Sequence, residues 1–172
     1  MTSLTPTTMS LDNSHMYSFT DLRKCIKGPK QYCKGSIMDI INSNADFSKF
    51  AYIIKLARLD NVLNDIQANF TIFVPSNRMI NDISEGVFTN LDISSARQIV
   101  LTSIIKYRIP SSLLSDSPAS YFITMNPVEK LFITNMNNII YINNCISVVH
   151  TDIEATNGLI HIVDKLIWPH FI

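Results

Sequence analysis

The chain has 172 residues and a formal net charge of zero at pH 7; 47% of its residues are hydrophobic and 16% are charged. This length suits one domain of ordinary size, and the apolar content supports a buried core rather than global disorder. The balanced charge argues against a nucleic-acid-binding protein, and no apolar run approaches the ~20 residues of a transmembrane helix. Because near-zero charge gives little repulsion between copies, weak self-association is permitted.

Residues 1–32 differ from the rest and predict a mostly flexible N-terminal arm, followed by a domain over residues 33–172. Within the arm, Pro6, Gly28 and Pro29 interrupt any regular pattern. Its start lacks the basic and then apolar stretches of a secretory signal, so the sequence leaves the cellular compartment open. A basic run begins in the arm, and we interpret it as a solvated stretch: Arg23, Lys24, Lys27, Lys30 and Lys34.

The three cysteines, Cys25, Cys33 and Cys145, permit two interpretations. Cys25 and Cys33 are close enough in sequence to pair with each other. An odd count is not typical of a disulfide framework, and an isolated cysteine with apolar neighbours commonly behaves as a small hydrophobic residue. The sequence therefore favours free thiols and leaves the pairing open.

Helical patterns dominate from Ser36 onward. Ser36 is predicted to cap a first short helix, Asp46 to precede a second, and Asp60 to open a third. In the second helix, apolar residues recur with the spacing of one helical face: Phe47, Phe50, Ala51 and Ile54.

A short β-rich run, Phe70–Val74, interrupts the helices and ends at Pro75, which cannot donate to a strand ladder. Helix is predicted to resume over Ser76–Ile83 and again over Ser94–Tyr107. The later helix has the clearest apolar stripe in the chain, and Ser95 with Gln98 fits a capping box at its start.

Strands separated by turns follow Pro110, and this order of helices first and strands afterwards indicates an α+β fold. Asn137-Asn138, Asn143-Asn144 and Asn157-Gly158 supply turn chemistry, because Asn and Gly tolerate the left-handed backbone of tight hairpins. The predicted strands are Tyr121–Met125, Lys130–Thr134, Ile139–Ile142, Cys145–Val149 and Leu159–Ile167.

Two segments of the chain, residues 70–77 (FTIFVPSN) and residues 155–169 (ATNGLIHIVDKLIWP), stand out as motifs. They resemble the first and the second signature of fasciclin-like domains, a family of adhesion domains, and the second signature is long and specific. The resemblance extends over about residues 35–170. Its signature positions in this chain are Thr71, Phe73, Pro75, Asn77, Asn157, Gly158, His161 and Asp164.

The resemblance implies an α+β fold in which N-terminal helices pack on a two-sheet β-wedge built from the C-terminal half. It also implies that the signature residues fasten the Asn157-Gly158 turn to the neighbouring strand by hydrogen bonds, which is a structural role. The chain departs from the family at Val74, where Ala is usual, and at Arg78-Met79-Ile80, where an acidic residue, Ala and Phe are typical.

Residues 105–110 (IKYRIP) stand where the family has a Tyr-His dipeptide followed by Pro, a place associated with its cell-receptor binding. Tyr107, Arg108 and Ile109 are therefore the candidate partner-binding residues, with Arg108 in place of the family's His. At the end of a predicted helix, the Tyr107 ring is expected to pack into the core with its hydroxyl bonded, and direct ligand contact is the alternative.

The sequence contains no clear catalytic constellation, and neither a catalytic residue nor a cofactor is expected. The four glycines are scattered, which excludes a glycine-rich phosphate loop, and no G-x-S-x-G nucleophile motif occurs. The tightest group of His and carboxylate residues is His150, Asp152, His161 and Asp164. A third His at ligand spacing is missing, so a metal site is not predicted, although His150 and Asp152 would share one face of a strand.

Two functions follow from these observations. The first is a non-enzymatic adhesion or matrix-type module that contacts a protein or glycan surface, for which the resemblance implies an extracellular or surface location. The alternative is a metal-dependent hydrolase that uses His150, Asp152 and His161. Asn69 begins the single N-x-T sequon and is a candidate glycosylation site in the first case.

Overall fold

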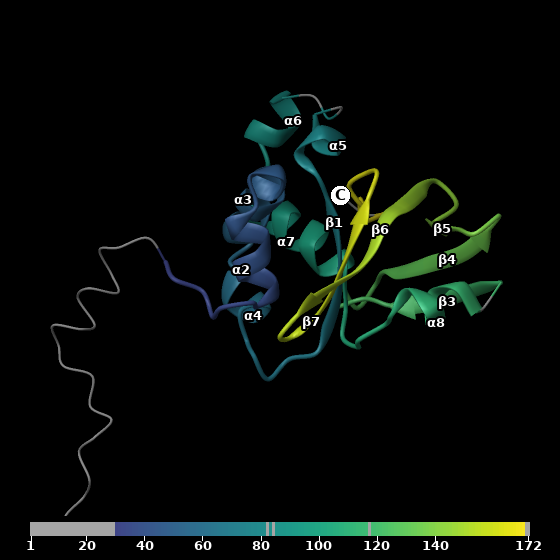
Figure 1. The fold of residues 1–172 in the computed structure, drawn as a ribbon. Helices are drawn as coiled ribbons and strands as arrows, with labels where there is room; N and C mark the ends of the chain where they lie inside the picture. The colour runs from purple at the N-terminus through teal and green to yellow at the C-terminus, as the bar shows by residue number, and fades with distance from the viewer. Residues whose placement is uncertain (1–29, 82, 84, 117, 171–172) are drawn as a thin grey trace, which may run out of the picture. The chain divides into compact units, whose positions relative to one another are not determined.

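The structure is a computed structural model that describes residues 30–81, 83, 85–116 and 118–170 (Figure 1). The described residues from Tyr32 onward form one compact unit. Most of the predicted arm lies outside the described residues, and so does Cys25, with its predicted alternative of pairing with Cys33. Within the described ranges, no helix combines the length and the apolar content needed to cross a bilayer.

Helices form most of the first half of this unit, largely where hydrophobic periodicity predicts them. Ser36 caps the first as expected, because its Oγ accepts a hydrogen bond from the Asp39 N–H at 3.1 Å. The helical elements are α2 (Ile37–Ser43), η1 (Ala45–Phe47), α3 (Ser48–Leu56), α4 (Asp60–Leu63), α5 (Asn77–Ile80), α6 (Glu85–Thr89), α7 (Ile93–Thr102) and α8 (Ser111–Asp116).

The predicted long helix over Ser94–Tyr107 is wrong at both ends. Asp92 caps α7 by accepting from the Ser95 N–H at 2.7 Å, so the Ser95–Gln98 capping box does not form. The helix stops at Thr102, and the next residues join the sheet as the short strand β2 (Ile104–Ile105). Ile104 fits the helical stripe, but the β-branched side chains of both residues also suit a buried strand, and pairing with β1 decides between the two.

Seven strands follow the order β2-β1-β7-β6-β5-β4-β3, and the pairing of β6 with both β5 and β7 joins them in one series. The α+β class is thus confirmed, whereas the division into two sheets is not. An isolated bridge between Ile105 and Thr124 links the two ends of the series and makes the sheet nearly barrel-like. The strands other than β2 are β1 (Phe70–Pro75), β3 (Ala119–Ile123), β4 (Lys130–Met136), β5 (Ile139–Ile142), β6 (Ile146–Ala155) and β7 (Gly158–Val163).

The two signature segments lie side by side as the parallel pair β1 and β7. Their register runs from Phe70 opposite Gly158 to Pro75 opposite Val163. β7 ends at Val163 and is therefore shorter than the predicted strand Leu159–Ile167.

Both faces of this central pair are buried, and each contributes to a different core. On one face, Ile72, Val74, Ile160 and Ile162 pack with the residues of α2, α3 and α7. On the other face, Phe73 and Val163 pack with side chains of β2, β4 and β5. Figure 1 shows this arrangement, with α2, α3, α4 and α7 on one side of β1 and with β3, β4 and β5 on the other.

Asparagines with left-handed backbone form the hairpin turns, as predicted. Asn137 and Asn138 have φ of 55° and 63° and connect β4 to β5 in a two-residue turn. Asn143 and Asn144 have φ of 52° and 59° and lie in the connection from β5 to β6. The third turn is shifted from the prediction, since Ala155 pairs with Gly158 and the two turn residues are Thr156 and Asn157.

Candidate functional site

The segment Tyr107–Ile109 leaves β2 and is held against the start of the β1–β7 pair by the buried side chain of Thr71. Thr71 Oγ1 donates to the Tyr107 carbonyl oxygen at 2.6 Å and accepts from the Ile109 N–H at 2.8 Å. A single hydroxyl thus satisfies one main-chain acceptor and one main-chain donor on either side of Arg108. This contact fixes the path of the backbone through the candidate partner-binding residues.

His161 holds the same segment from β7. Its Nδ1 accepts from the Asp152 N–H at 3.2 Å, and its Nε2 lies 2.9 Å from the Ile109 carbonyl oxygen. Since a carbonyl can only accept, Nε2 carries the proton and the ring is the neutral tautomer. Burial lowers the pKa of His161 below its usual value, although the Ile109 carbonyl and the Asp152 carboxylate act in the opposite direction. The ring also stacks on Phe73, with centroids 5.6 Å apart.

Asp152 lies at an irregularity of β6 and connects this strand to α8. It has φ of 60°, and the register of β6 against β7 shifts on both sides of His150. The Asp152 carboxylate accepts from the Ser111 N–H at 2.9 Å and from the Ser111 hydroxyl, and so caps the first residue of α8. Partial burial raises the pKa of Asp152, but the hydrogen bonds from Ser111 outweigh it and hold the pKa below its usual value.

These contacts argue against the alternative hydrolase site of His150, Asp152 and His161. Both ring nitrogens of His161 are bonded to main-chain groups, and the Asp152 carboxylate is bonded to Ser111. His161 is also fully buried, whereas His150 is exposed. Among the described residues, no group of three His, Cys, Asp or Glu side chains is placed to hold a metal ion.

Arg108 contacts the β6–β7 hairpin, whereas Tyr107 is largely exposed. Arg108 Nη1 donates to the Gly158 carbonyl oxygen at 3.1 Å, and Nη2 forms an ion pair with Glu154. The Tyr107 ring is 71% exposed, so the expectation that it packs into the core is wrong. The reason is the early end of α7, because a strand and a turn, rather than a helical stripe, now set the direction of this side chain.

The other signature residues of the second segment hold the two ends of the β6–β7 hairpin. Asn157 is buried; its Oδ1 accepts from the Ile37 N–H at 2.8 Å, and its Nδ2 donates to the carbonyl oxygens of Leu63 and Asp65. At the far end, the Asp164 carboxylate accepts from the N–H and the hydroxyl of Ser147.

In the first signature segment, Asn77 connects helices to one another. Its Oδ1 accepts from the Lys49 N–H at 2.9 Å, and its Nδ2 donates to Ala45 and Ser48. Pro75 is the last residue of β1 and is buried. Asn69, the candidate glycosylation site, is exposed just before β1.

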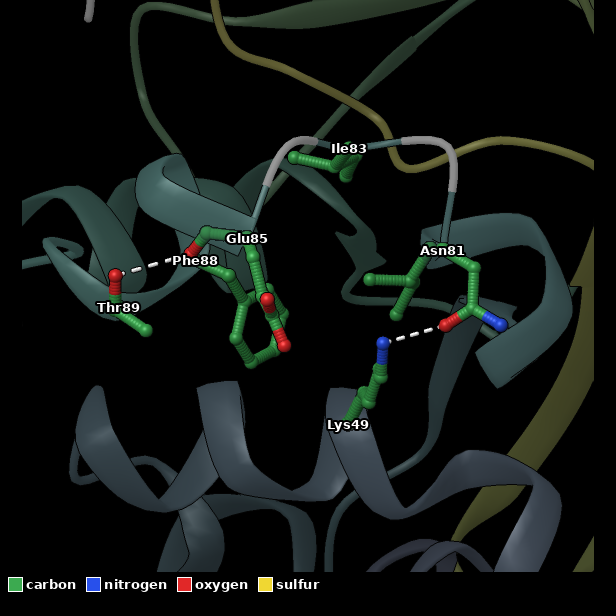
Figure 2. Close-up of a pocket in the computed structure, with 7 residues that line it drawn as sticks. Lys49, Asn81, Ile83, Glu85, Phe88 and Thr89 are labelled. Carbon is green, nitrogen blue, oxygen red and sulfur yellow. Dashed lines mark hydrogen bonds between the residues drawn. The ribbon is translucent and has the colours of Figure 1, made fainter.

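A hollow of about 520 Å³ lies between α3, α5 and α6 (Figure 2). Lys49 Nζ donates to Asn81 Oδ1 across it and lies 5.8 Å from the centre of the Phe88 ring. Thr89 Oγ1 donates to the Glu85 carbonyl oxygen at 3.0 Å. The charged residues that line the hollow, Lys49 and Glu85, have opposite signs, so its charge favours neither an anion nor a cation.

A comparison of this chain against protein families matches the fasciclin domain to residues 45–169. The chain belongs to the fasciclin domain family. Among curated proteins, the transforming growth factor-beta-induced protein ig-h3 of Oryctolagus cuniculus is 26% identical over 137 residues, which are 78% of this chain and 19% of that protein. Human periostin is 26% identical over 139 residues, covering 78% of this chain and 16% of its own length.

This fasciclin chain thus spans about a fifth of the length of ig-h3 and less of periostin. A protein of Synechocystis, sll1735, is 27% identical over 133 residues and is matched over 96% of its length. Among solved structures, a FAS1 domain pair from the insect cell adhesion molecule fasciclin I has a TM-score of 0.67 at 20% identity. That match covers 79% of this chain and 51% of the solved chain, and it shows the fold.

Sequence reasoning missed two residues of this site, Ser111 and Glu154. Ser111 follows Pro110 and opens the short run Ser-Ser-Leu-Leu, which is a helix-start signal that the expectation of strands after Pro110 concealed. Glu154 carries no local signal, since it meets Arg108 only through the pairing of β6 with β7.

Proposed function

We propose that this fasciclin domain is a non-enzymatic adhesion module that binds a partner protein through Tyr107 and the backbone around it. The observation that carries the proposal is a largely exposed tyrosine on a segment whose main chain is fixed by Thr71 and His161. Tyrosine is enriched among the residues that dominate binding energy at protein interfaces. A prearranged backbone reduces the ordering cost of binding, which favours such a residue further.

Arg108 supports the proposal in the place of the histidine that is usual in the family. Its guanidinium is occupied by Gly158 and Glu154, so it braces the segment beside Tyr107 instead of offering a free charge. Ile109 is buried at 5% exposure and contributes through its main chain. Tyr107 is therefore the residue of this group that we expect to contact the partner directly.

The family supports an adhesive role for the module, which we take to be the domain of residues 33–172. The structural relative from an insect is described as a cell adhesion molecule. Two of the three residues of the alternative hydrolase, Asp152 and His161, are already bonded to Ser111 and to main-chain groups. An adhesive partner can be a protein or a glycan, and a tyrosine ring can contact either.

Retention of the purified full chain on cells, matrix proteins and immobilised glycans tests the proposal. We expect Tyr107→Ala to weaken retention by roughly tenfold or more, as for a residue at the centre of an interface. Tyr121→Ala is the matched control, because Tyr121 on β3 is also 71% exposed. Equal retention of both variants would show that Tyr107 is not part of the partner-binding site. No retention of the unaltered chain on any of these surfaces would overturn the adhesive role.

A further inference from the structure

Besides the hollow between α3, α5 and α6, the structure has a groove at the end of β7 where the chain continues past Val163. This end of β7 is opposite to the end that Arg108 contacts, next to Tyr107. The groove has a volume of about 490 Å³, which falls within the ~300–1,000 Å³ range of small-molecule sites. Its apolar lining comes from three separate parts of the fold: Met79 of α5, Ile146 of β6, and Leu166 and Trp168 after β7. Leu166 and Ile146 are buried, whereas the Trp168 side chain is 39% exposed.

The basic residues that line this groove are Lys165 and His170. His170 has its own partner, since its Nδ1 lies 2.7 Å from Oε2 of the buried Glu129. Lys165 is exposed, and its Nζ donates to the Cys145 carbonyl oxygen at 2.9 Å. An ammonium group has three N–H donors, so Lys165 retains donors for a further acceptor at the rim.

We propose that this groove binds a small amphipathic anion, a carboxylate with an aliphatic or aromatic body. The body would lie on Trp168, Leu166 and Ile146, and the carboxylate would accept from Lys165 Nζ. Charge complementarity selects an anion, because Lys165 brings a positive charge to the rim and none of the described lining residues is an Asp or a Glu. The apolar walls select against a small hydrophilic anion, because burial of apolar surface supplies the larger part of the affinity of such ligands.

The sole tryptophan of the chain, Trp168, lines the groove, so its fluorescence reports on the site directly. The full chain is titrated with decanoate below its critical micelle concentration, with the neutral alcohol decanol and with the short anion butyrate. We expect decanoate to change the Trp168 emission saturably, decanol to bind more weakly, and butyrate to have little effect. Lys165→Gln should weaken the binding of decanoate by about three- to tenfold and leave the binding of decanol unchanged.

Lys130→Gln is the matched control, because Lys130 is an exposed lysine of β4 that does not line the groove. A second measurement uses the exposed Cys145, also in the lining, in a Cys25→Ser, Cys33→Ser background. Decanoate should slow its alkylation at the concentrations that change the fluorescence.

Equal affinity for decanoate and decanol, or equal effects of Lys165→Gln and Lys130→Gln, would overturn the assignment of the anion. A fluorescence change that follows the protein concentration instead of the ligand would assign the groove to a second copy of the chain and overturn the proposal.

Discussion

At the scale of single residues, buried polar side chains near the β6–β7 hairpin are bonded mainly to main-chain groups of other elements. Thr71, Asn157 and His161 each bond two or more such groups, and none of them is exposed. An unpaired buried donor or acceptor costs about 1–3 kcal/mol of stability. By pairing such main-chain groups, each of these side chains stabilises the contact between its own segment and another element. In particular both ring nitrogens of His161, a residue type that often acts in catalysis, are bonded to main-chain groups.

Gly158 provides the first prediction at this scale. Its φ is +152°, and a Cβ at this position would lie 2.0 Å from the Phe70 carbonyl oxygen of the paired strand. We expect Gly158→Val to destabilise the domain by at least the ~1–3 kcal/mol of a strained backbone, measured by urea denaturation. Gly86→Ala is the control, because nothing lies within 4 Å of its added Cβ and alanine favours a helix. An unchanged unfolding midpoint for Gly158→Val would show that β7 does not approach β1 as described.

His161 predicts how stability depends on pH. Its folded-state pKa is held below the unfolded value of about 6.5, so the unfolded chain binds more protons as the pH falls. The free energy of unfolding should therefore decrease below about pH 6.5, with a limiting slope of about 1.4 kcal/mol per pH unit from His161. Above about pH 7.5, the titration of His161 should no longer change the free energy of unfolding.

Urea denaturation of the unaltered chain and of His161→Gln between pH 5 and pH 8 measures this effect. The variant should be less stable at pH 8 and should lose part of the acid dependence. His150→Gln, which replaces an exposed histidine, should keep the dependence of the unaltered chain. A steep acid dependence that survives in His161→Gln would place its origin in another group.

At the scale of elements, short-range chemistry governs where hairpins turn. The type I′ geometry of a two-residue turn requires positive φ at both positions, and Asn137-Asn138 meets this without glycine. The helix caps are also local, as Ser36 and Asp92 show. The strand β2 and the helix α8 are different, because each depends on a partner far along the chain, β1 in one case and Asp152 in the other.

The turn between β4 and β5 gives the prediction at this scale. Asn138 has φ of 63° and is exposed, so its side chain matters chiefly through the backbone that it tolerates. Asn138→Val should destabilise the domain by about 1–2 kcal/mol, whereas Asn138→Gly should be tolerated or stabilising. Thermal unfolding of the two variants measures the difference, and equal melting temperatures would contradict a left-handed backbone at this position.

At the scale of the whole molecule, the parallel pairing of β1 with β7 joins the helical half to the strand-rich half. Asn157 strengthens this connection, because from the turn between β6 and β7 it bonds the start of α2, the last residue of α4 and Asp65 just after α4. The helix-side core and the sheet-side core share these two strands as a common wall. Neither half can lose its packing without exposing a face of the same strands.

We therefore expect the domain to unfold as one cooperative unit. The far-ultraviolet circular dichroism, which reports chiefly on the helices, and the Trp168 fluorescence should give the same urea midpoint. Asn157→Ala removes three hydrogen bonds to main-chain groups and should lower both midpoints together, by the equivalent of about 2–4 kcal/mol. Asn69→Ala, at an exposed asparagine, is the control. Two separate midpoints in the unaltered chain would show that the shared strands do not couple the halves.

The sequence by itself determined the local features of this protein: the periodic helices, the hairpin turns with asparagine, and the two signature segments that indicate a fasciclin domain. Each of these depends on residues within a few positions of one another, where backbone preference and hydrophobic spacing are sufficient. The tertiary structure alone decided that Ile104–Ile105 forms a strand, that Tyr107 is exposed, that Asp152 caps α8, and that Lys165 and Trp168 line one groove. These outcomes depend on strand pairing and burial between segments tens of residues apart, and no local pattern encodes the energy of such contacts.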